Sequence, residues 1–230
     1  SDLTPGLANK LAIPGAVKVC CNFPETLNYL PKDKAVLTGS PIRQELLKGN
    51  ANHAFSMCRF SDRTKPVILI VGGSTGSRAI NTAIRGLLPE LIKSYNVIHL
   101  CGKGNLDETL YSVSGYAQFE YANQELSDLF ALADLVISRA GANAICELLA
   151  LRKPNILIPL PAEASRGDQI LNANSFRSQG FSYVLEEANL SNTALLEAVE
   201  HVFAKKEEYI QAMENSSSRN SIDTIVGLLL

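Results

Sequence analysis

The sequence lacks three features that would assign it at once to a particular class: long hydrophobic runs, an excess of charge of one sign, and paired cysteines. No apolar run reaches the about 18 residues of a membrane-spanning helix, so any membrane contact is expected to be peripheral. The 21 basic and 23 acidic residues nearly cancel and form no dense basic cluster, which argues against a nucleic-acid partner. With 230 residues, 46% of them hydrophobic, the chain is long enough for one large globular domain or slightly more.

The cysteines and histidines show no spacing typical of a metal site. The five cysteines form no CxxC pair and the three histidines form no cluster with them, so we expect no metal. The odd cysteine count and the apolar surroundings of Cys20, Cys101 and Cys146 favour reduced thiols packed in a core, as in a cytoplasmic protein. The first residues do not form a secretion signal.

From Pro66 onward, short apolar runs alternate with longer segments of helical period. This pattern predicts an α/β fold with a Rossmann-like, doubly wound parallel sheet, whose ligands bind beyond the carboxyl ends of the strands. The expected strands are Val67–Val71, Val97–Cys101, Gln118–Tyr121, Leu135–Ser138, Asn155–Pro159 and Ser182–Leu185. The expected helices are Ser77–Ser94, Asn105–Ser112, Gln124–Ala131, Asn143–Leu151 and Gln169–Ser178, followed by further C-terminal helices.

The first forty residues do not fit this repeating pattern. They predict helices at Pro5–Leu11 and Pro24–Tyr29 and strands at Val17–Phe23 and Ala35–Thr38. Because two strands alone do not make a stable sheet in water, we expect residues 1–40 to be the tail of an N-terminal domain, cut from a longer protein. Residues 41–230 are then expected to form a second domain that includes the C-terminal helices. Within it, Gly49–Lys65 has little apolar periodicity and is predicted to be a surface connector.

Glycines and serines follow the first strand of the larger domain, in the segment from Gly72 to Ser77 that leads into a helix. Gly73 and Ser74 lie where backbone N–H groups can approach an anion, which suits a diphosphate. Packing alone also produces such turns, and that alternative stays open. The segment is not a Walker A loop, and the next strand ends without the acidic residue of a dinucleotide site.

A second strand end, Ser138 to Glu147, also feeds a helix. Gly141, Ala142 and Asn143 leave room for a ligand at the helix start, and the Glu147 carboxylate could accept both hydroxyls of a ribose diol. In the alternative interpretation, Glu147 only complements the helix dipole.

A third strand end runs from Pro159 to Ala173. Asp168 and Gln169 place an acceptor and an amide near another helix start, a combination suited to sugar hydroxyls. Asp168 could instead be a helix N-cap with no ligand.

Three segments, one of them between the two expected domains, together resemble a known family. The run from Gly39 to Arg43, the glycines 72–76 and the segment Ser138–Glu147 are similar to motifs of the bacterial N-acetylglucosaminyltransferases that act on lipid-linked muramoyl-pentapeptide in peptidoglycan synthesis. The resemblance covers nearly the whole chain. It implies a two-domain GT-B fold, of which this chain would hold the C-terminal half and a remnant of the N-terminal half.

The resemblance also implies roles for individual residues. The donor would be UDP-N-acetylglucosamine, with no cofactor and no metal, and Asp2 matches a cleft position weakly. The implied substrate-binding residues are Arg43 on the nucleotide, Gly73 and Ser74 on phosphate, Tyr121 and Ala122 on uracil, Gly141, Ala142, Asn143 and Glu147 on the diphosphate and ribose, and Asp168 and Gln169 on the sugar. Thr75 and Asp168 depart from the family pattern.

The family's acceptor loop and its neighbouring histidine match no residue here. The catalytic base is therefore expected outside this chain, and the chain alone is expected to bind the donor without transferring its sugar. The implied partners are a UDP-sugar and, through the other half, the lipid-linked acceptor, with no nucleic acid. The implied location is cytoplasmic, peripheral on the inner face of the plasma membrane. Two alternatives remain: a split nucleotide-sugar-binding subunit that needs a partner chain, and a UDP-sugar hydrolase or epimerase of the same fold.

Overall fold

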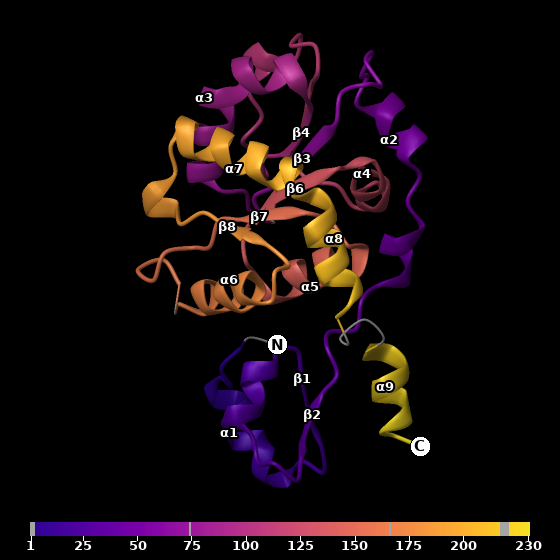
Figure 1. The fold of residues 1–230 in the computed structure, drawn as a ribbon, viewed down its shortest axis with the longest axis vertical. Helices are drawn as coiled ribbons and strands as arrows, with labels where there is room; N and C mark the ends of the chain where they lie inside the picture. Colours follow the sequence, from indigo (N-terminus) through magenta and orange to yellow (C-terminus); the bar gives the residue numbers. More distant parts are fainter. Residues whose placement is uncertain (1–2, 74, 166, 217–220) are drawn as a thin grey trace.

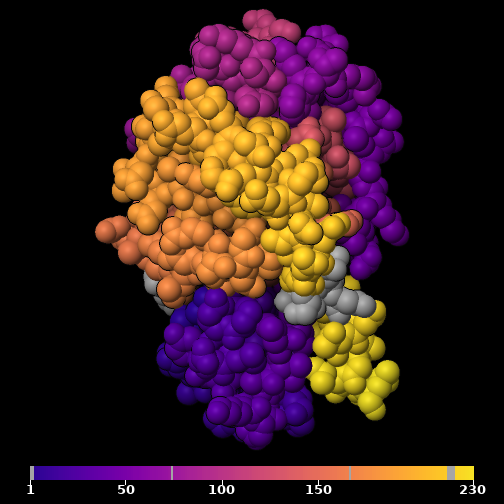
Figure 2. All heavy atoms as spheres, in the orientation of Figure 1, coloured from indigo at the N-terminus to yellow at the C-terminus, as the bar shows by residue number. Residues whose placement is uncertain are grey.

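The computed structural model describes residues 3–73, 75–165, 167–216 and 221–230. A large α/β body carries a smaller lobe made by the N-terminal residues, seen in indigo at the bottom of Figures 1 and 2. The body contains a parallel sheet of six strands in the order β5-β4-β3-β6-β7-β8. The strands are β3 (Val67–Val71), β4 (Asn96–Leu100), β5 (Tyr116–Phe119), β6 (Leu135–Ser138), β7 (Asn155–Leu157) and β8 (Tyr183–Val184).

This strand order confirms the predicted doubly wound sheet. The first strand of this sheet, β3, lies in its middle, and β4 and β5 follow outward on one side. The chain then crosses back to β6, and β7 and β8 follow outward on the other side. The switch of direction falls between β3 and β6, the place where open α/β sheets bind ligands. The loops that leave these two strands are therefore the ones that position the candidate site.

Helices cover both faces of the sheet (Figure 1). Along β3, Ile68 and Ile70 pack with α3 and α7 on one face, whereas Val67 and Leu69 pack with the helices of the other face. Such alternation, with every strand residue buried or nearly so, is what a parallel sheet covered on both sides requires. The helices of the body are α2 (Ala51–Met57), α3 (Arg78–Ser94), α4 (Leu126–Leu132), α5 (Ala142–Leu151), α6 (Asp168–Ser178), α7 (Asn192–Ala204) and α8 (Lys206–Glu214).

The small lobe consists of short elements. Its strands β1 (Val19–Cys21) and β2 (Ala35–Leu37) pair in parallel, next to α1 (Leu7–Ala12). Phe23 attaches the lobe to the body: it is 1% exposed and meets Phe176 of α6 edge-to-face, with ring centroids 6.1 Å apart. The C-terminal helix α9 (Ser221–Gly227) reaches the connecting segment, residues 38–50 between β2 and α2, where Ser221 Oγ donates to the Ser40 carbonyl at 2.6 Å.

The prediction of a surface connector at residues 49–65 is wrong, because this segment contains helix α2. Asn50 caps the helix by accepting hydrogen bonds from the N–H groups of Asn52 and His53. Four side chains of the segment are buried in the core, namely Ala54, Phe55, Cys58 and Phe60. The capping asparagine was the available signal, but the helix spans only two turns, too few for a clear apolar period.

Two other expectations need correction. The helix expected at Asn105–Ser112 is only the 3-10 turn Glu108–Leu110: Asp107 caps its start, but the bonds that follow join the Tyr111 N–H to the Glu108 carbonyl and the Val113 N–H to the Leu110 carbonyl, which is 3-10 and not α-helical spacing. Cys101 and Cys146 are buried as expected, but Cys20 is exposed, because successive residues of a strand face opposite sides and its neighbour Cys21 takes the inward position. Within the described part of the chain, no helix is long and apolar enough to cross a membrane.

A buried histidine lies in the middle of the sheet. His99 of β4 is 0% exposed; its Nδ1 lies 2.9 Å from the Tyr116 hydroxyl and its Nε2 lies 2.9 Å from Asn81 Oδ1. Asn81 Nδ2 donates to the Cys101 carbonyl, so its Oδ1 must accept from the imidazole Nε2–H. Burial, with a smaller contribution from the Arg85 cation, lowers the pKa of His99 to about 3 from its ordinary value of 6.5.

The stability of the chain should therefore fall as the pH drops below neutrality. The unfolded chain binds a proton on His99 near pH 6.5 while the folded chain resists it down to pH about 3, so the stabilisation is present above pH 6.5 and is lost as the pH falls through this window. We expect a loss of about 2 kcal/mol between pH 7 and pH 5. Urea unfolding at both pH values measures it. A His99→Gln variant with the same pH dependence as the native chain would contradict the assignment.

Candidate functional site

The glycine-rich loop (residues 72–77) leaves β3 at the switch point of the sheet. A Cβ on Gly76, whose φ is +77°, would lie 2.1 Å from the Cys101 carbonyl oxygen, so packing against the loop after β4 requires this glycine. Gly73 differs: its φ is +93°, it is exposed, and a Cβ there would meet nothing within 4 Å. The packing interpretation therefore accounts for Gly76, whereas Gly73 lies on the open side of the loop. Ser74, predicted to contact phosphate, and Asp2, matched to a cleft position, lie outside the described residues.

The second predicted loop leaves β6, the strand next to β3. Helix α5 starts at Ala142, and its N-cap Gly141 has no side chain to cap the first N–H groups. A Cβ on Gly141 would meet nothing within 4 Å, and Asn143 in the first turn is exposed, whereas Ala142 is buried. The start of this ten-residue helix thus presents backbone donors on the same edge as the glycine-rich loop.

Two predicted nucleotide residues from distant parts of the sequence meet beside α5. Arg43 Nη2 lies 3.6 Å from Glu147 Oε1, and the two side chains are 64% and 22% exposed. Burial raises the pKa of the Glu147 carboxyl, and the Arg43 cation opposes this shift. Glu147 lies in the second turn of α5 and faces a cation, so the helix dipole alone does not account for it.

The third predicted loop, the β7–α6 loop (residues 158–167), is joined to the β6–α5 loop by hydrogen bonds of Gln169, the second residue of α6. Gln169 Oε1 accepts from the Ala140 N–H of the β6–α5 loop at 3.2 Å and from the Leu160 N–H of the β7–α6 loop at 3.1 Å. Within the described residues its Nε2 group donates to no acceptor, so the amide keeps its donor side available. The alternative that Asp168 is an N-cap is wrong, because the N-cap of α6 is Gly167, with φ +78°, and Asp168 is the first helical residue.

The predicted uracil residues lie farther along the same edge, after β5. Tyr121 is 58% exposed and Ala122 is half-buried. A groove of about 400 Å³ lies beside them, between the connecting segment and the start of α4, lined by Arg43, Glu45, Leu46, Asn123, Gln124 and Ser127. Arg43, the partner of Glu147, and Asn123, the residue that follows Ala122, both line this groove.

One residue of this edge was missed by the sequence reasoning. Arg139, directly after β6, has a side chain only 11% exposed and forms an ion pair with Glu187, Nη2 to Oε2 2.5 Å. It also donates to Ser77 Oγ at 2.6 Å and to the carbonyls of Ile158 at 3.0 Å and Pro159 at 3.3 Å. A cation next to a buried strand was the only signal in the sequence.

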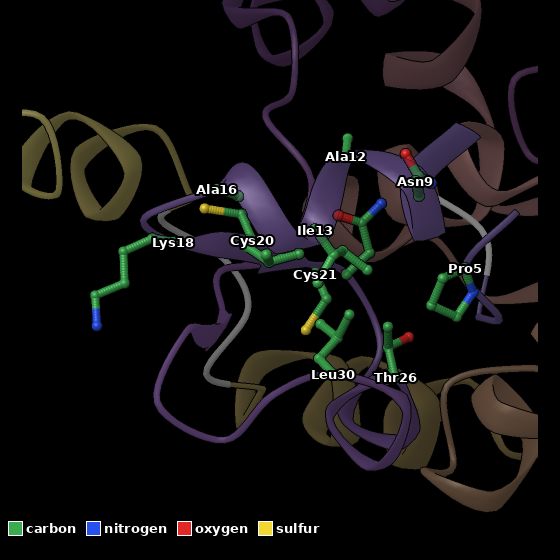
Figure 3. A pocket seen from close by; sticks show the side chains of 12 residues that line it. Pro5, Asn9, Ala12, Ile13, Ala16, Lys18, Cys20, Cys21, Thr26 and Leu30 are labelled. Atoms are coloured by element: carbon green, nitrogen blue, oxygen red, sulfur yellow. The ribbon is translucent and has the colours of Figure 1, made fainter. Parts of the chain in front are cut away.

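A separate pocket lies in the small lobe, away from these loops. It has a volume of about 290 Å³ and is lined by side chains of α1, β1 and the neighbouring segment, among them Ile13, Cys21 and Leu30 (Figure 3). None of the predicted site residues lines it. Within the described residues, no group of three or more histidine, cysteine or acidic side chains could hold a metal ion.

Comparisons with known proteins agree with this arrangement. A family model described as the glycosyltransferase family 28 C-terminal domain matches residues 67–226. A UDP-N-acetylglucosamine–N-acetylmuramyl-(pentapeptide) pyrophosphoryl-undecaprenol N-acetylglucosamine transferase of Lachnoclostridium phytofermentans is 63% identical over 229 residues, which is 100% of this chain and 64% of that protein. This chain therefore spans less than two thirds of that relative's length.

Two solved structures show a similar fold. The MurG structure from Acinetobacter baumannii matches with a TM-score of 0.73 at 21% identity, over 99% of this chain and 64% of that one. The UDP-GlcNAc 2-epimerase from Neisseria meningitidis, bound to UDP-GlcNAc, matches with a TM-score of 0.67 at 16% identity, over 98% of this chain and 64% of that one. The region that the family model matches, residues 67–226, contains the whole six-stranded sheet. This chain therefore belongs to glycosyltransferase family 28 and carries that family's C-terminal domain.

Proposed function

We propose that this chain is the donor-binding part of a transferase that moves N-acetylglucosamine from UDP-N-acetylglucosamine to a lipid-linked muramoyl-pentapeptide. The observation that carries the proposal is the pairing of Glu147 with Arg43 beside the uncapped start of α5. A carboxylate suits the ribose diol, and the free N–H groups of the helix start suit the diphosphate. The name of the Lachnoclostridium relative supplies the donor and acceptor.

The proposed chemistry is a direct displacement at the anomeric carbon of the donor sugar. The acceptor hydroxyl attacks, a base removes its proton, and UDP leaves with the bonding electrons. Backbone N–H groups of the helix starts behind Gly76 and Gly141 would face the leaving diphosphate, where negative charge grows, which is an effective way to lower the barrier. The scheme needs neither a metal nor a cofactor. It takes the base and the acceptor site from the part of the relatives that this chain does not span.

The proposed acceptor is attached to a lipid, so we place the whole protein on the inner face of the plasma membrane as a peripheral protein. The open edge of β1 and the small-lobe pocket beside it are where the remainder of an N-terminal domain would pack. Epimerisation or hydrolysis of a UDP-sugar is the second candidate, favoured by the likeness in fold to the Neisseria epimerase.

Titration calorimetry with UDP-N-acetylglucosamine, UDP-glucose and UDP-galactose tests the proposal. We expect UDP-N-acetylglucosamine to bind most tightly, and incubation with a lipid-linked muramoyl acceptor to give no transfer. Conversion of the bound sugar without any acceptor would favour the epimerase or hydrolase, and an absence of binding to all three donors would reject the site.

A Gln169→Glu variant should separate sugar recognition from nucleotide binding. The new carboxylate can still accept from the Ala140 and Leu160 N–H groups, but the amide donor that we assign to a sugar hydroxyl is lost. We expect UDP-N-acetylglucosamine to lose about tenfold more affinity than UDP does, equivalent to one hydrogen bond of about 1.4 kcal/mol. Gln179→Glu, at the other end of α6, is the control. Equal losses for both ligands would place Gln169 outside the sugar site.

A further inference from the structure

The Arg139 guanidinium bridges the glycine-rich loop, assigned to the diphosphate, and the β7–α6 loop, which leads to the proposed sugar residues at the start of α6. Through Nη2 it holds Ser77, the last residue of the glycine-rich loop, and through Nη1 it holds the carbonyls of Ile158 and Pro159 at the start of the β7–α6 loop. Glu187, located shortly after β8, neutralises its charge. A single side chain thus contacts the segments that leave β3, β7 and β8.

The contact with the β7–α6 loop is completed from the other side by Gln169. Arg139 binds the oxygen of the Pro159–Leu160 peptide, and Gln169 binds its N–H. Gln169 also binds the Ala140 N–H, and Asn172 Nδ2 donates to the Ala140 carbonyl at 3.2 Å. The peptide from which the β7–α6 loop departs therefore has a fixed position relative to the β6–α5 loop and to Ser77.

The contacts of Arg139 also depend on the shape of its head group. A guanidinium presents several N–H donors in a rigid plane, so one group can donate to a hydroxyl and two carbonyls while its charge pairs with a carboxylate. A lysine ammonium would keep the charge but is a single point, unable to span Ser77 and the carbonyls of Ile158 and Pro159.

We propose that Arg139 is a positioning residue that sets the distance between the glycine-rich loop and the β7–α6 loop, so that the diphosphate and the sugar of one donor molecule are held together. The inference rests on the proposed function. Arg139 itself touches neither group in this scheme: it acts through Ser77 on one side and through the Pro159–Leu160 peptide on the other. Uridine carries neither the diphosphate nor the N-acetylglucosamine, so its affinity should not depend on Arg139.

The test compares the affinities of three ligands for the native chain and for Arg139→Lys. We expect uridine and UDP to bind within about twofold of native, and UDP-N-acetylglucosamine to lose at least tenfold, so that the ratio of its affinity to that of UDP falls. The control is Arg152→Lys, since Arg152 makes one exposed ion pair, with Glu214 at 2.7 Å. A purely structural role would lower the unfolding temperature and leave the ratio unchanged in the folded variant, which would overturn the proposal.

A second pair of variants covers the case in which Arg139→Lys does not fold. Ser77→Ala removes the hydroxyl that Arg139 holds and also the N-cap of α3, whereas Ser191→Ala removes the N-cap of α7, which has no arginine partner. Only Ser77→Ala should lower the affinity ratio. Equal ratios in the two serine variants would reject the positioning role, whereas a native chain that binds none of the three ligands would reject the proposed function itself.

Discussion

A Gly76→Ala variant should lose at least about 3 kcal/mol of unfolding free energy. The residue has φ +77°, which costs any side chain about 1 kcal/mol or more. The added Cβ would also lie 2.1 Å from the Cys101 oxygen and 3.0 Å from Gly102 Cα. Both obstacles are backbone atoms, so relief requires the loop after β4 to move.

Urea unfolding measures this loss, and a second glycine separates its two causes. Gly104 has φ +73°, but a Cβ there would meet nothing within 4 Å, so Gly104→Ala should show the conformational cost alone. The additional loss of unfolding free energy in Gly76→Ala, compared with Gly104→Ala, is then the steric contribution. If the two variants unfolded at the same urea concentration, the close approach of the two loops would not be what requires Gly76.

A Glu147→Gln variant should bind UDP about 10- to 100-fold more weakly than the native chain, corresponding to one charge-assisted hydrogen bond of about 1.5–3 kcal/mol. The carboxylate accepts two ribose hydroxyls in the proposed complex, whereas an amide offers one acceptor oxygen and no charge. The fold should persist, since Glu147 is 22% exposed and its ion pair with Arg43 spans 3.6 Å. Calorimetric titration with UDP gives the affinity.

Two controls tie this loss to the ribose. Glu214→Gln removes an exposed carboxylate from a comparable arginine pair, with Arg152, and should bind UDP as the native chain does. The ligand 2′-deoxy-UDP lacks one of the two hydroxyls, so it should lose less affinity than UDP on going from native to Glu147→Gln. Equal losses for both nucleotides would show that Glu147 acts through Arg43 and not on the diol.

The strands and the loops that leave them were predictable because β3, β4 and β6 are buried on both faces and appear in the sequence as short apolar runs. Their parallel order then placed the glycine-rich loop and the start of α5 on one edge without further information. Helix α2 was missed because its burial depends on α4: Asp128 accepts from the Asn50 N–H at 2.6 Å, a contact between distant parts of the chain. The pattern of apolar residues within the segment gives no information about that contact.

The contacts within the candidate site were less predictable than its residue types. Gln169 was identified as an amide at a helix start, but its oxygen is engaged by Ala140 and Leu160, from two other loops. The contacts of Arg139 likewise come from three separate segments. Such bonds depend on the relative placement of strand ends in space, which strand order alone does not give. The ligand contacts themselves stay predictions.

Because its strands are short, the small lobe should unfold locally before the α/β body unfolds. Strands β1 and β2 have three residues each and pair only with one another within the described residues, whereas β3 lies between two partners in the centre of the sheet. Amide protons of β1 should therefore exchange with deuterium through local opening, and those of β3 only when the whole body unfolds. Two levels of exchange protection are expected in one polypeptide, and a thermal melt followed by a signal from the body would leave the earlier opening undetected.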